Sequence, residues 1–211
     1  MSHISDVING FYDANCSNSL STETIKDDPT WIDHCLANPE MHDPDYAIFA
    51  HFRDPQSTVL DVGANWGYSV TSILATGCRS SIISFEPLAC YAPHLTRLKE
   101  KLPGRFNFFS YGLGAESAEL RFVTPVLNGD VLTAYTSASE SAHRENLWRN
   151  LEWEVAQRKT AKIDLKFIVS RASVRKLDEA AANIVNICAP SRLIPKATPR
   201  AERYRGRSGH A

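Results

Sequence analysis

Long apolar runs are missing from this chain of 211 residues. No uninterrupted apolar stretch approaches the roughly 18 residues that suggest a membrane-spanning helix. The first residues, Met-Ser-His-Ile-Ser-Asp, lack the basic-then-apolar order of a secretory signal peptide. These two absences predict a soluble, cytoplasmic protein without a membrane partner.

The sequence also lacks a surplus of either charge and any close pair of cysteines. A formal net charge of -1 gives no reason to expect nucleic acid as a partner. The five cysteines are scattered, with no C-x-x-C pair, which argues against a disulfide framework and against a zinc site. They are Cys16, Cys35, Cys78, Cys90 and Cys188. We interpret His42-Asp43-Pro44-Asp45 as a solvated turn, so no metal is expected.

Three segments differ in their residue patterns. Residues 1–55 combine short apolar periodicities with turns and predict an N-terminal helical segment. Residues 56–189 hold a regular alternation of strand and helix patterns, which predicts one α/β domain. Residues 190–211 are basic and rich in proline and glycine, and we predict a disordered tail there.

The α/β domain begins with three predicted strands. They cover residues 58–62, 81–85 and 106–111, and each is short and mainly apolar. Between them lie two helical patterns, one ending near Gly77 and one beginning near Pro93. Strand–helix–strand alternation of this kind predicts a parallel sheet with right-handed crossovers and helices on both faces.

The second half of the domain has a different rhythm. Residues 119–123 and 163–169 alternate like half-buried strands, and residues 139–159 are typical of a helix. Asn128-Gly129-Asp130 predicts a turn. The apolar run at residues 184–188 predicts a fourth core strand.

The run from Val59 to Ser69 carries the first functional signal. A predicted strand ends at Asp61, and Gly63 and Gly67 bracket the turn into a helix. Glycine lets backbone N–H groups approach a ligand closely, and the positive end of the following helix suits a carboxylate or a phosphate. The alternative is a tight strand-to-helix turn that binds nothing.

Glu86 follows the second predicted strand directly. At the carboxyl end of a parallel strand, an acidic side chain can accept hydrogen bonds from both hydroxyls of a ribose. Because the two strands are expected to be neighbours, Glu86 and Asp61 should lie at the same edge of the sheet. A merely solvated Glu86 is the alternative.

The spacing of the glycines distinguishes among cofactors. A dinucleotide site favours G-x-G-x-x-G, whereas this loop has Asn65 at the second glycine position. A phosphate-binding loop needs G-K-[ST], which is absent. The loop therefore suits a cofactor with an adenosine end and an amino-acid end but no phosphate, a description that fits S-adenosylmethionine.

Three successive motifs resemble those of the FkbM family of S-adenosylmethionine-dependent methyltransferases. They are Val59-Leu60-Asp61-Val62-Gly63-Ala64-Asn65-Trp66-Gly67-Tyr68, then Phe85-Glu86-Pro87, then Tyr111-Gly112-Leu113-Gly114 before Leu120-Arg121-Phe122. The resemblance covers residues 57–124. It implies methylation of hydroxyl oxygens, often on sugars or natural products.

The resemblance also implies a set of cofactor-binding residues and a fold. The residues are Asp61, Gly63, Ala64, Asn65, Gly67, Glu86, Pro87, Gly112 and Leu113. The methionine end of the cofactor would lie along the glycine loop, the ribose at Glu86, and the adenine near Gly112 and Leu113. The fold would be the class I methyltransferase fold, a Rossmann-like three-layer sandwich with a mostly parallel sheet.

The chain departs from the family pattern after the third motif. Members usually continue with a strand ending in Lys-Ile-Asp-Val-Glu-Gly, but here those charged positions hold Asn186, Cys188 and Pro190. The last strands of the family sheet have no counterpart, and no catalytic residue is assigned.

The favoured function is transfer of a methyl group from S-adenosylmethionine to a hydroxyl of a small molecule or sugar. One alternative is a binding module of the same fold without turnover, as the altered segment at 184–190 suggests. A nicotinamide-dependent oxidoreductase is the other, and Asn65 argues against it. A sheet edge left open by the missing strands predicts a homodimer.

Overall fold

The computed structural model describes residues 3–21, 28–158 and 163–188, which form an α/β arrangement with two sheets. The first is parallel, with the order β1 (Thr58–Val62), β2 (Ser81–Phe85) and β3 (Phe106–Phe109). The second is mixed and has the order β4-β7-β5-β6. The predicted strands at 58–62 and 81–85 are confirmed, and the third is shorter than predicted. The single sheet that the sequence predicted is replaced by two.

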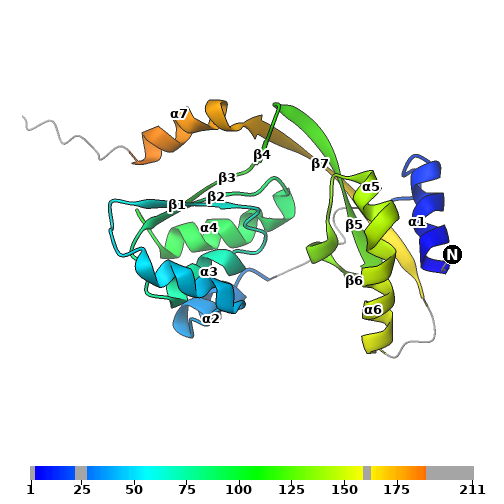
Figure 1. Ribbon diagram of the computed structural model, residues 1–211, viewed down its shortest axis with the longest axis horizontal. Coiled ribbons are helices and arrows are strands. Elements are labelled where there is room, and N and C mark those ends of the chain that lie inside the picture. Colours follow the sequence, from blue (N-terminus) through cyan, green and yellow to red (C-terminus); the bar gives the residue numbers. More distant parts are fainter. Residues whose placement is uncertain (1–2, 22–27, 159–162, 189–211) are drawn as a thin grey trace, which may run out of the picture.

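Helices pack on one face of the parallel sheet. They are α3 (Tyr68–Ala75) and α4 (Ala92–Lys101), with α2 (Trp31–Ala37) packed against them and the 3-10 helix η2 (Pro44–His51) alongside (Figure 1). Val59 and Ile82 of the sheet share a buried apolar cluster with Val70 and Leu95 of these helices. Pro93 stands in the first turn of α4, where its missing N–H costs no helical hydrogen bond.

The opposite face of the parallel sheet is covered by α7 (Leu177–Cys188), which lies across it from α4 in Figure 1. The predicted strand at 184–188 is therefore wrong. Ala180 and Ile184, one helical turn apart, pack against Ile83 and Phe85 of β2, a spacing of four that suits a helix. The preceding alanines favour a helix, and a short apolar run alone does not distinguish the two structures.

The second sheet is dominated by two long strands. β5 (Ala118–Leu127) and β7 (Leu165–Lys176) pair antiparallel, while β4 (Gly112–Gly114) and β6 (Asp130–Val131) extend the sheet at its two sides. The predicted turn at Asn128 joins β5 to β6, and the predicted strand at 119–123 lies within β5. The predicted strand at 163–169 is confirmed from residue 165 onward, where β7 begins.

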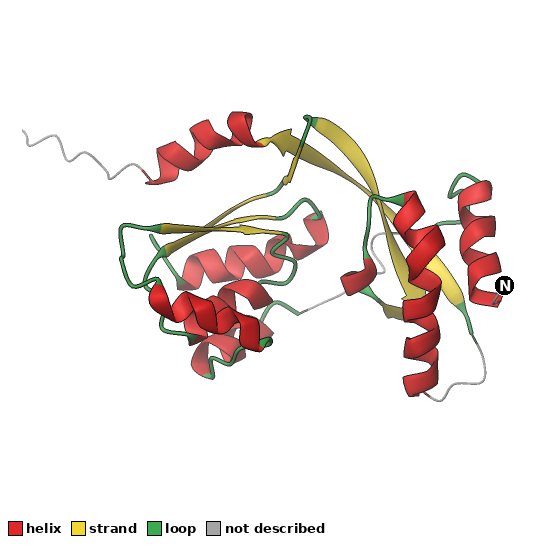
Figure 2. Cartoon of the chain, in the orientation of Figure 1, coloured by secondary structure: helices red, strands yellow, loops and turns green. Residues whose placement is uncertain are grey.

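Helices gather beside these long strands, as Figure 2 shows. They are α1 (His3–Asp13), the short α5 (Glu140–Ala142), the π-helical turn η5 (His143–Leu147) and α6 (Trp148–Arg158). The helical pattern at 139–159 is thereby confirmed up to residue 158, beyond which it lies outside the described residues. Within the predicted N-terminal segment, α1 packs on the second sheet, whereas α2 packs on the first. The predicted tail, residues 190–211, also lies outside the described residues.

None of the helices within residues 3–21, 28–158 and 163–188 combines the length and the apolar character that crossing a membrane requires.

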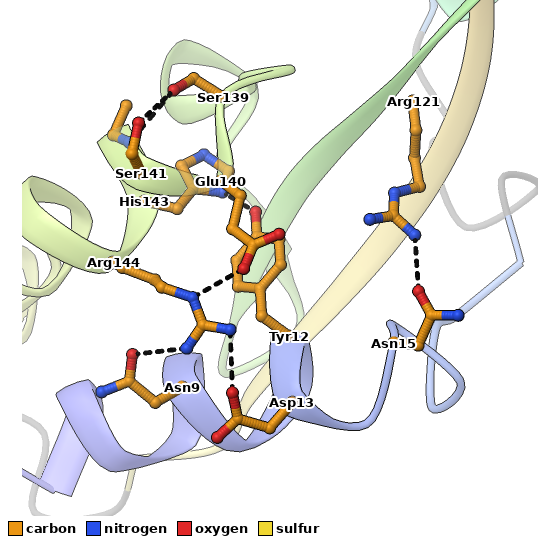
Figure 3. Close-up of polar contacts among 11 residues, drawn as sticks. Asn9, Tyr12, Asp13, Asn15, Arg121, Ser139, Glu140, Ser141, His143 and Arg144 are labelled. Carbon is orange, nitrogen blue, oxygen red and sulfur yellow. Dashed lines mark hydrogen bonds and ion pairs between the residues drawn. The ribbon is translucent and has the colours of Figure 1, made fainter.

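A buried polar network fixes α1 to the π-helical turn. The hydroxyl of Tyr12 lies 2.6 Å from Nδ1 of His143 (Figure 3). Nε2 of His143 lies 2.9 Å from the carbonyl oxygen of Tyr135. A carbonyl only accepts, so Nε2 carries a proton. Burial lowers the pKa of His143 and so favours the neutral imidazole, in which Nδ1 accepts from the hydroxyl of Tyr12.

Arg144 forms ion pairs beside Tyr12 and His143. Its guanidinium lies 2.9 Å from Asp13 and 2.8 Å from Glu140, and it donates to Asn9 at 3.1 Å. The same group stacks over the ring of Tyr12, 5.3 Å from its centroid. These contacts order the C-terminal half of α1 against α5 and η5.

We predict that the free energy of unfolding falls as pH drops below about 6.5, the ordinary pKa of histidine. Because burial lowers the pKa of His143 in the folded chain, the unfolded chain binds a proton first and acid favours unfolding. Urea denaturation at pH 5 and pH 7 measures the difference in the free energy of unfolding between the two pH values. This difference should shrink in His143→Gln and persist in His51→Gln, because His51 is exposed. An unchanged slope in His143→Gln would contradict the assignment.

Candidate functional site

The loop from Gly63 to Gly67 bends tightly over the end of β2. Gly63, Asn65 and Gly67 all have left-handed backbone angles, with φ of 87°, 51° and 92°. The N–H of Gly63 donates to the carbonyl oxygen of Phe85 at 2.8 Å, which ties the loop to the neighbouring strand. Side chains with a Cβ are strained in this conformation, asparagine least among them, so the residue types match the turn.

Glu86 holds this loop in place. One carboxylate oxygen accepts from the N–H of Asn65 at 2.8 Å and the other from the N–H of Leu88 at 2.8 Å. The side chain is buried, and burial raises its pKa, although the two backbone donors act in the opposite direction. Each carboxylate oxygen has a further lone pair, so Glu86 can accept additional hydrogen bonds from a ligand.

Asp61 lies on the adjacent strand but faces the helices. Its Oδ2 accepts hydrogen bonds from Ser69 of α3 at 2.9 Å and from Ser84 of β2 at 2.8 Å. Burial raises its pKa, and its charge also contributes to raising that of Glu86. The two carboxylates are thus close enough to interact. Asp61 nevertheless lines a separate hollow of about 250 Å³ beside η2.

Glu86 lines a cavity of about 230 Å³ between the two sheets. The turns that follow β1 and β2 contribute Gly63, Asn65, Glu86, Pro87, Leu88 and Tyr91. Strand β5 and the segment after β6 contribute Phe122, Thr133, Ala134 and Thr136. Tyr91 ends the 3-10 helix η3 (Ala89–Tyr91), and Thr133 begins the 3-10 helix η4 (Thr133–Tyr135). The second group has no local sequence signal, because only the long β5–β7 pairing brings it to the loop.

Polar contacts join the two halves of the cavity. The indole N–H of Trp66 donates to the hydroxyl of Thr133 at 3.2 Å, and Thr133 and Thr136 hydrogen-bond the hydroxyl of Tyr91. Burial raises the pKa of Tyr91, so the phenol is protonated at neutral pH. Burial also raises the pKa of the nearby Cys90 thiol, to about 11, which leaves it a poor nucleophile.

The remaining predicted residues do not line the cavity. Ala64 is buried in the apolar cluster under the sheet, and Gly67 packs against Leu98 of α4. Gly112 lies beside the ring of Pro87, and Leu113 packs with the residues beneath α7. Of the nine predicted residues, the cavity itself brings together Gly63, Asn65, Glu86 and Pro87.

A larger hollow, of about 840 Å³, lies at the amino ends of the parallel strands and is lined by Thr58, Ser81 and Ile187 among others. Ligands of open α/β sheets bind outside the carboxyl ends, so position favours the smaller cavity at Glu86. Within the described ranges, no group of three or more histidine, cysteine, aspartate or glutamate side chains is arranged to hold a metal ion.

Comparison of the chain with models of known protein families, with curated proteins and with solved structures gave no match.

We predict that Gly67→Ala destabilises the fold by about 1–3 kcal/mol more than Gly77→Ala. Both glycines have positive φ, but a Cβ on Gly67 would overlap Cδ1 of Leu98, while nothing lies within 4 Å of a Cβ on Gly77. Urea denaturation measures the free energy of unfolding of both variants. Because both share the backbone strain of a positive φ, the difference between them reports the clash with Leu98 alone. Equal losses would show that Gly67 is not needed for packing α3 against α4.

Proposed function

We propose that this chain binds S-adenosylmethionine at the carboxyl ends of β1 and β2 in a class I methyltransferase fold. The observation that carries the proposal is the position of Glu86. It follows β2 directly and lines the same cavity as Gly63, which follows the neighbouring strand β1. Parallel strands with α3 and α4 on one face and α7 on the other support a Rossmann-like arrangement. The motifs resembling the FkbM family support the choice of cofactor.

The residues at the cavity fit the nucleoside end of this cofactor. A Cβ built on Gly63 would meet nothing within 4 Å, so the backbone there is open to a ligand. The free lone pairs of Glu86 suit the two hydroxyls of a ribose. Phe122 and Pro87 supply apolar surface for a flat base.

The size of the cavity limits what it encloses. At about 230 Å³ it falls below the roughly 300 Å³ at which ligand pockets usually begin. The cavity therefore suits the adenosine part, and the amino-acid end would extend along the Gly63–Gly67 loop towards solvent.

The proposed reaction is methyl transfer to a hydroxyl of a small molecule or sugar. The cofactor, when bound, supplies a methyl group activated by its sulfonium. The part of this chain is to hold the nucleoside through Glu86 and to exclude water with Phe122, because methyl transfer depends mainly on alignment of the two reactants.

A second candidate is a cofactor-binding module without turnover. Among the described residues that line the cavity, only Glu86 and Tyr91 titrate. The remaining lone pairs of Glu86 would be taken by the ribose hydroxyls, and Tyr91 keeps its proton at neutral pH. Neither is available as a general base for the acceptor hydroxyl, and this observation favours binding without catalysis.

Isothermal titration calorimetry with S-adenosylhomocysteine, the demethylated product, tests the proposal. We expect saturable binding to the wild-type chain, and no binding of NAD under the same conditions. Methyl transfer from labelled S-adenosylmethionine to a panel of sugars then separates the enzyme from the binding module. NAD binding in place of the adenosyl ligand would favour the oxidoreductase instead.

Glu86→Ala should weaken binding of S-adenosylhomocysteine by about 1–3 kcal/mol, as expected for loss of polar contacts to a ligand. Calorimetry measures the change, and circular dichroism confirms that the variant folds, because Glu86 also holds the loop. The matched control is Glu145→Ala, an exposed glutamate of η5. Equal affinity in the two variants would remove Glu86 from the ribose site.

Ala134→Trp tests the cavity without touching the loop. Ala134 is exposed at the cavity wall, so an indole there would fill space that the nucleoside needs. We expect affinity for S-adenosylhomocysteine to fall by roughly a hundredfold, about 2.7 kcal/mol. Ala156→Trp, an exposed position on α6, should bind like the wild type. Undiminished binding by Ala134→Trp would place the ligand elsewhere.

A further inference from the structure

Among the described residues, β1 stands at the edge of the parallel sheet. Within the described ranges β1 pairs with β2 alone. The carbonyl oxygen of Ser57 accepts from the N–H of Ser81, and the N–H of Gly63 donates to the carbonyl oxygen of Phe85. The odd-numbered residues from 57 to 63 therefore turn their backbone groups towards β2. The N–H and C=O of Leu60 and Val62 therefore point away from the sheet.

The same strand leaves apolar side chains uncovered. Leu60 and Val62 lie in register with Ile83 and Phe85 of β2 and share their face of the sheet. Ile83 and Phe85 are 1% and 0% exposed beneath α7, whereas Leu60 and Val62 are 44% and 61% exposed. Parallel sheets are normally covered on both faces, so this part of the sheet lacks a layer.

We propose that a second copy of the chain pairs with this edge, β1 against β1, across a two-fold axis at Leu60. Identical edges related by a two-fold axis must run antiparallel, and the same patch then serves both copies. Leu60 would face the partner's Leu60, and the two residues would exchange both N–H to C=O hydrogen bonds because their backbone groups point outward. The two parallel sheets would join into one.

Charge selects this register over the neighbouring one. With the axis at Leu60, Asp61 stands opposite the partner's Val59. With the axis at Asp61, two carboxylates would stand directly opposite each other, which destabilises a strand pair. Asp61 is also held inward by Ser69 and Ser84, so it does not obstruct the pairing at Leu60.

The ends of β1 are complementary in charge. Asp45 lines the hollow beside Leu60, Asp61 and Val62, and exposed Asp43 precedes it. At the amino end of β1, the backbone N–H of exposed Arg79 donates to the carbonyl oxygen of Phe52. The next two residues, Arg53 and Asp54, are also exposed. Antiparallel pairing brings the acidic end of each copy to the net basic end of the other, which favours a second copy as the occupant.

Sedimentation velocity over a range of concentrations tests the proposal, and we expect a reversible species of twice the chain's mass. Leu60→Lys places two cations opposite each other at the axis and should raise the dimer dissociation constant roughly tenfold or more. Leu120→Lys is the matched control, because Leu120 is a strand leucine of β5 with 37% exposure. It should dimerise like the wild type.

Cysteine cross-linking gives a second readout that does not depend on Leu60→Lys folding. Leu60→Cys should form a disulfide-linked dimer under mild oxidation, because the axis brings the two thiols together, while Leu120→Cys and the wild type should remain unlinked. A monomer at every concentration would overturn the proposal. So would open-ended oligomers, or a dimer that tolerates Leu60→Lys and is not trapped by Leu60→Cys.

Discussion

The carboxylate of Glu86 is the constraint on which the site depends. It accepts one backbone hydrogen bond from the loop after β1, at Asn65, and one from the segment after β2, at Leu88. A buried carboxylate is costly unless such donors satisfy it, so the side chain and the two turns stabilise one another. The left-handed turn at Gly63 and Asn65 is compatible with this arrangement because of its residue types.

Residues of the second sheet and of η4 line the cavity opposite this loop. The long pairing of β5 with β7 positions Phe122 and η4 opposite the loop, and the hydrogen bond from Trp66 to Thr133 joins the two halves. The site is therefore a junction between a parallel sheet, which presents backbone and carboxylate, and a mixed sheet, which presents an aromatic ring and hydroxyls. The open edge of β1 belongs to the same parallel sheet but points away from β2, so pairing there leaves Glu86 in place.

Local chemistry made part of this structure predictable. The strands at 58–62 and 81–85 follow from short apolar runs bounded by turn residues, and Glu86 follows from its place at a strand end. Residues 184–188 form a helix because Ala180 and Ile184 pack one turn apart on β2, a tertiary contact that the run itself does not encode. Thr133 and Phe122 could not be predicted as site residues, because their proximity to Gly63 depends on pairing between distant strands. The division into two sheets has the same origin.

We propose that an adenosyl compound binds in the cavity at Glu86, and a crystal structure of the protein grown with S-adenosylhomocysteine would reveal its position. We expect electron density for the nucleoside between Gly63 and Phe122, with both ribose hydroxyls within about 3.2 Å of the Glu86 carboxylate. Density for the ligand at another surface, with the cavity at Glu86 closed by η4, would contradict it.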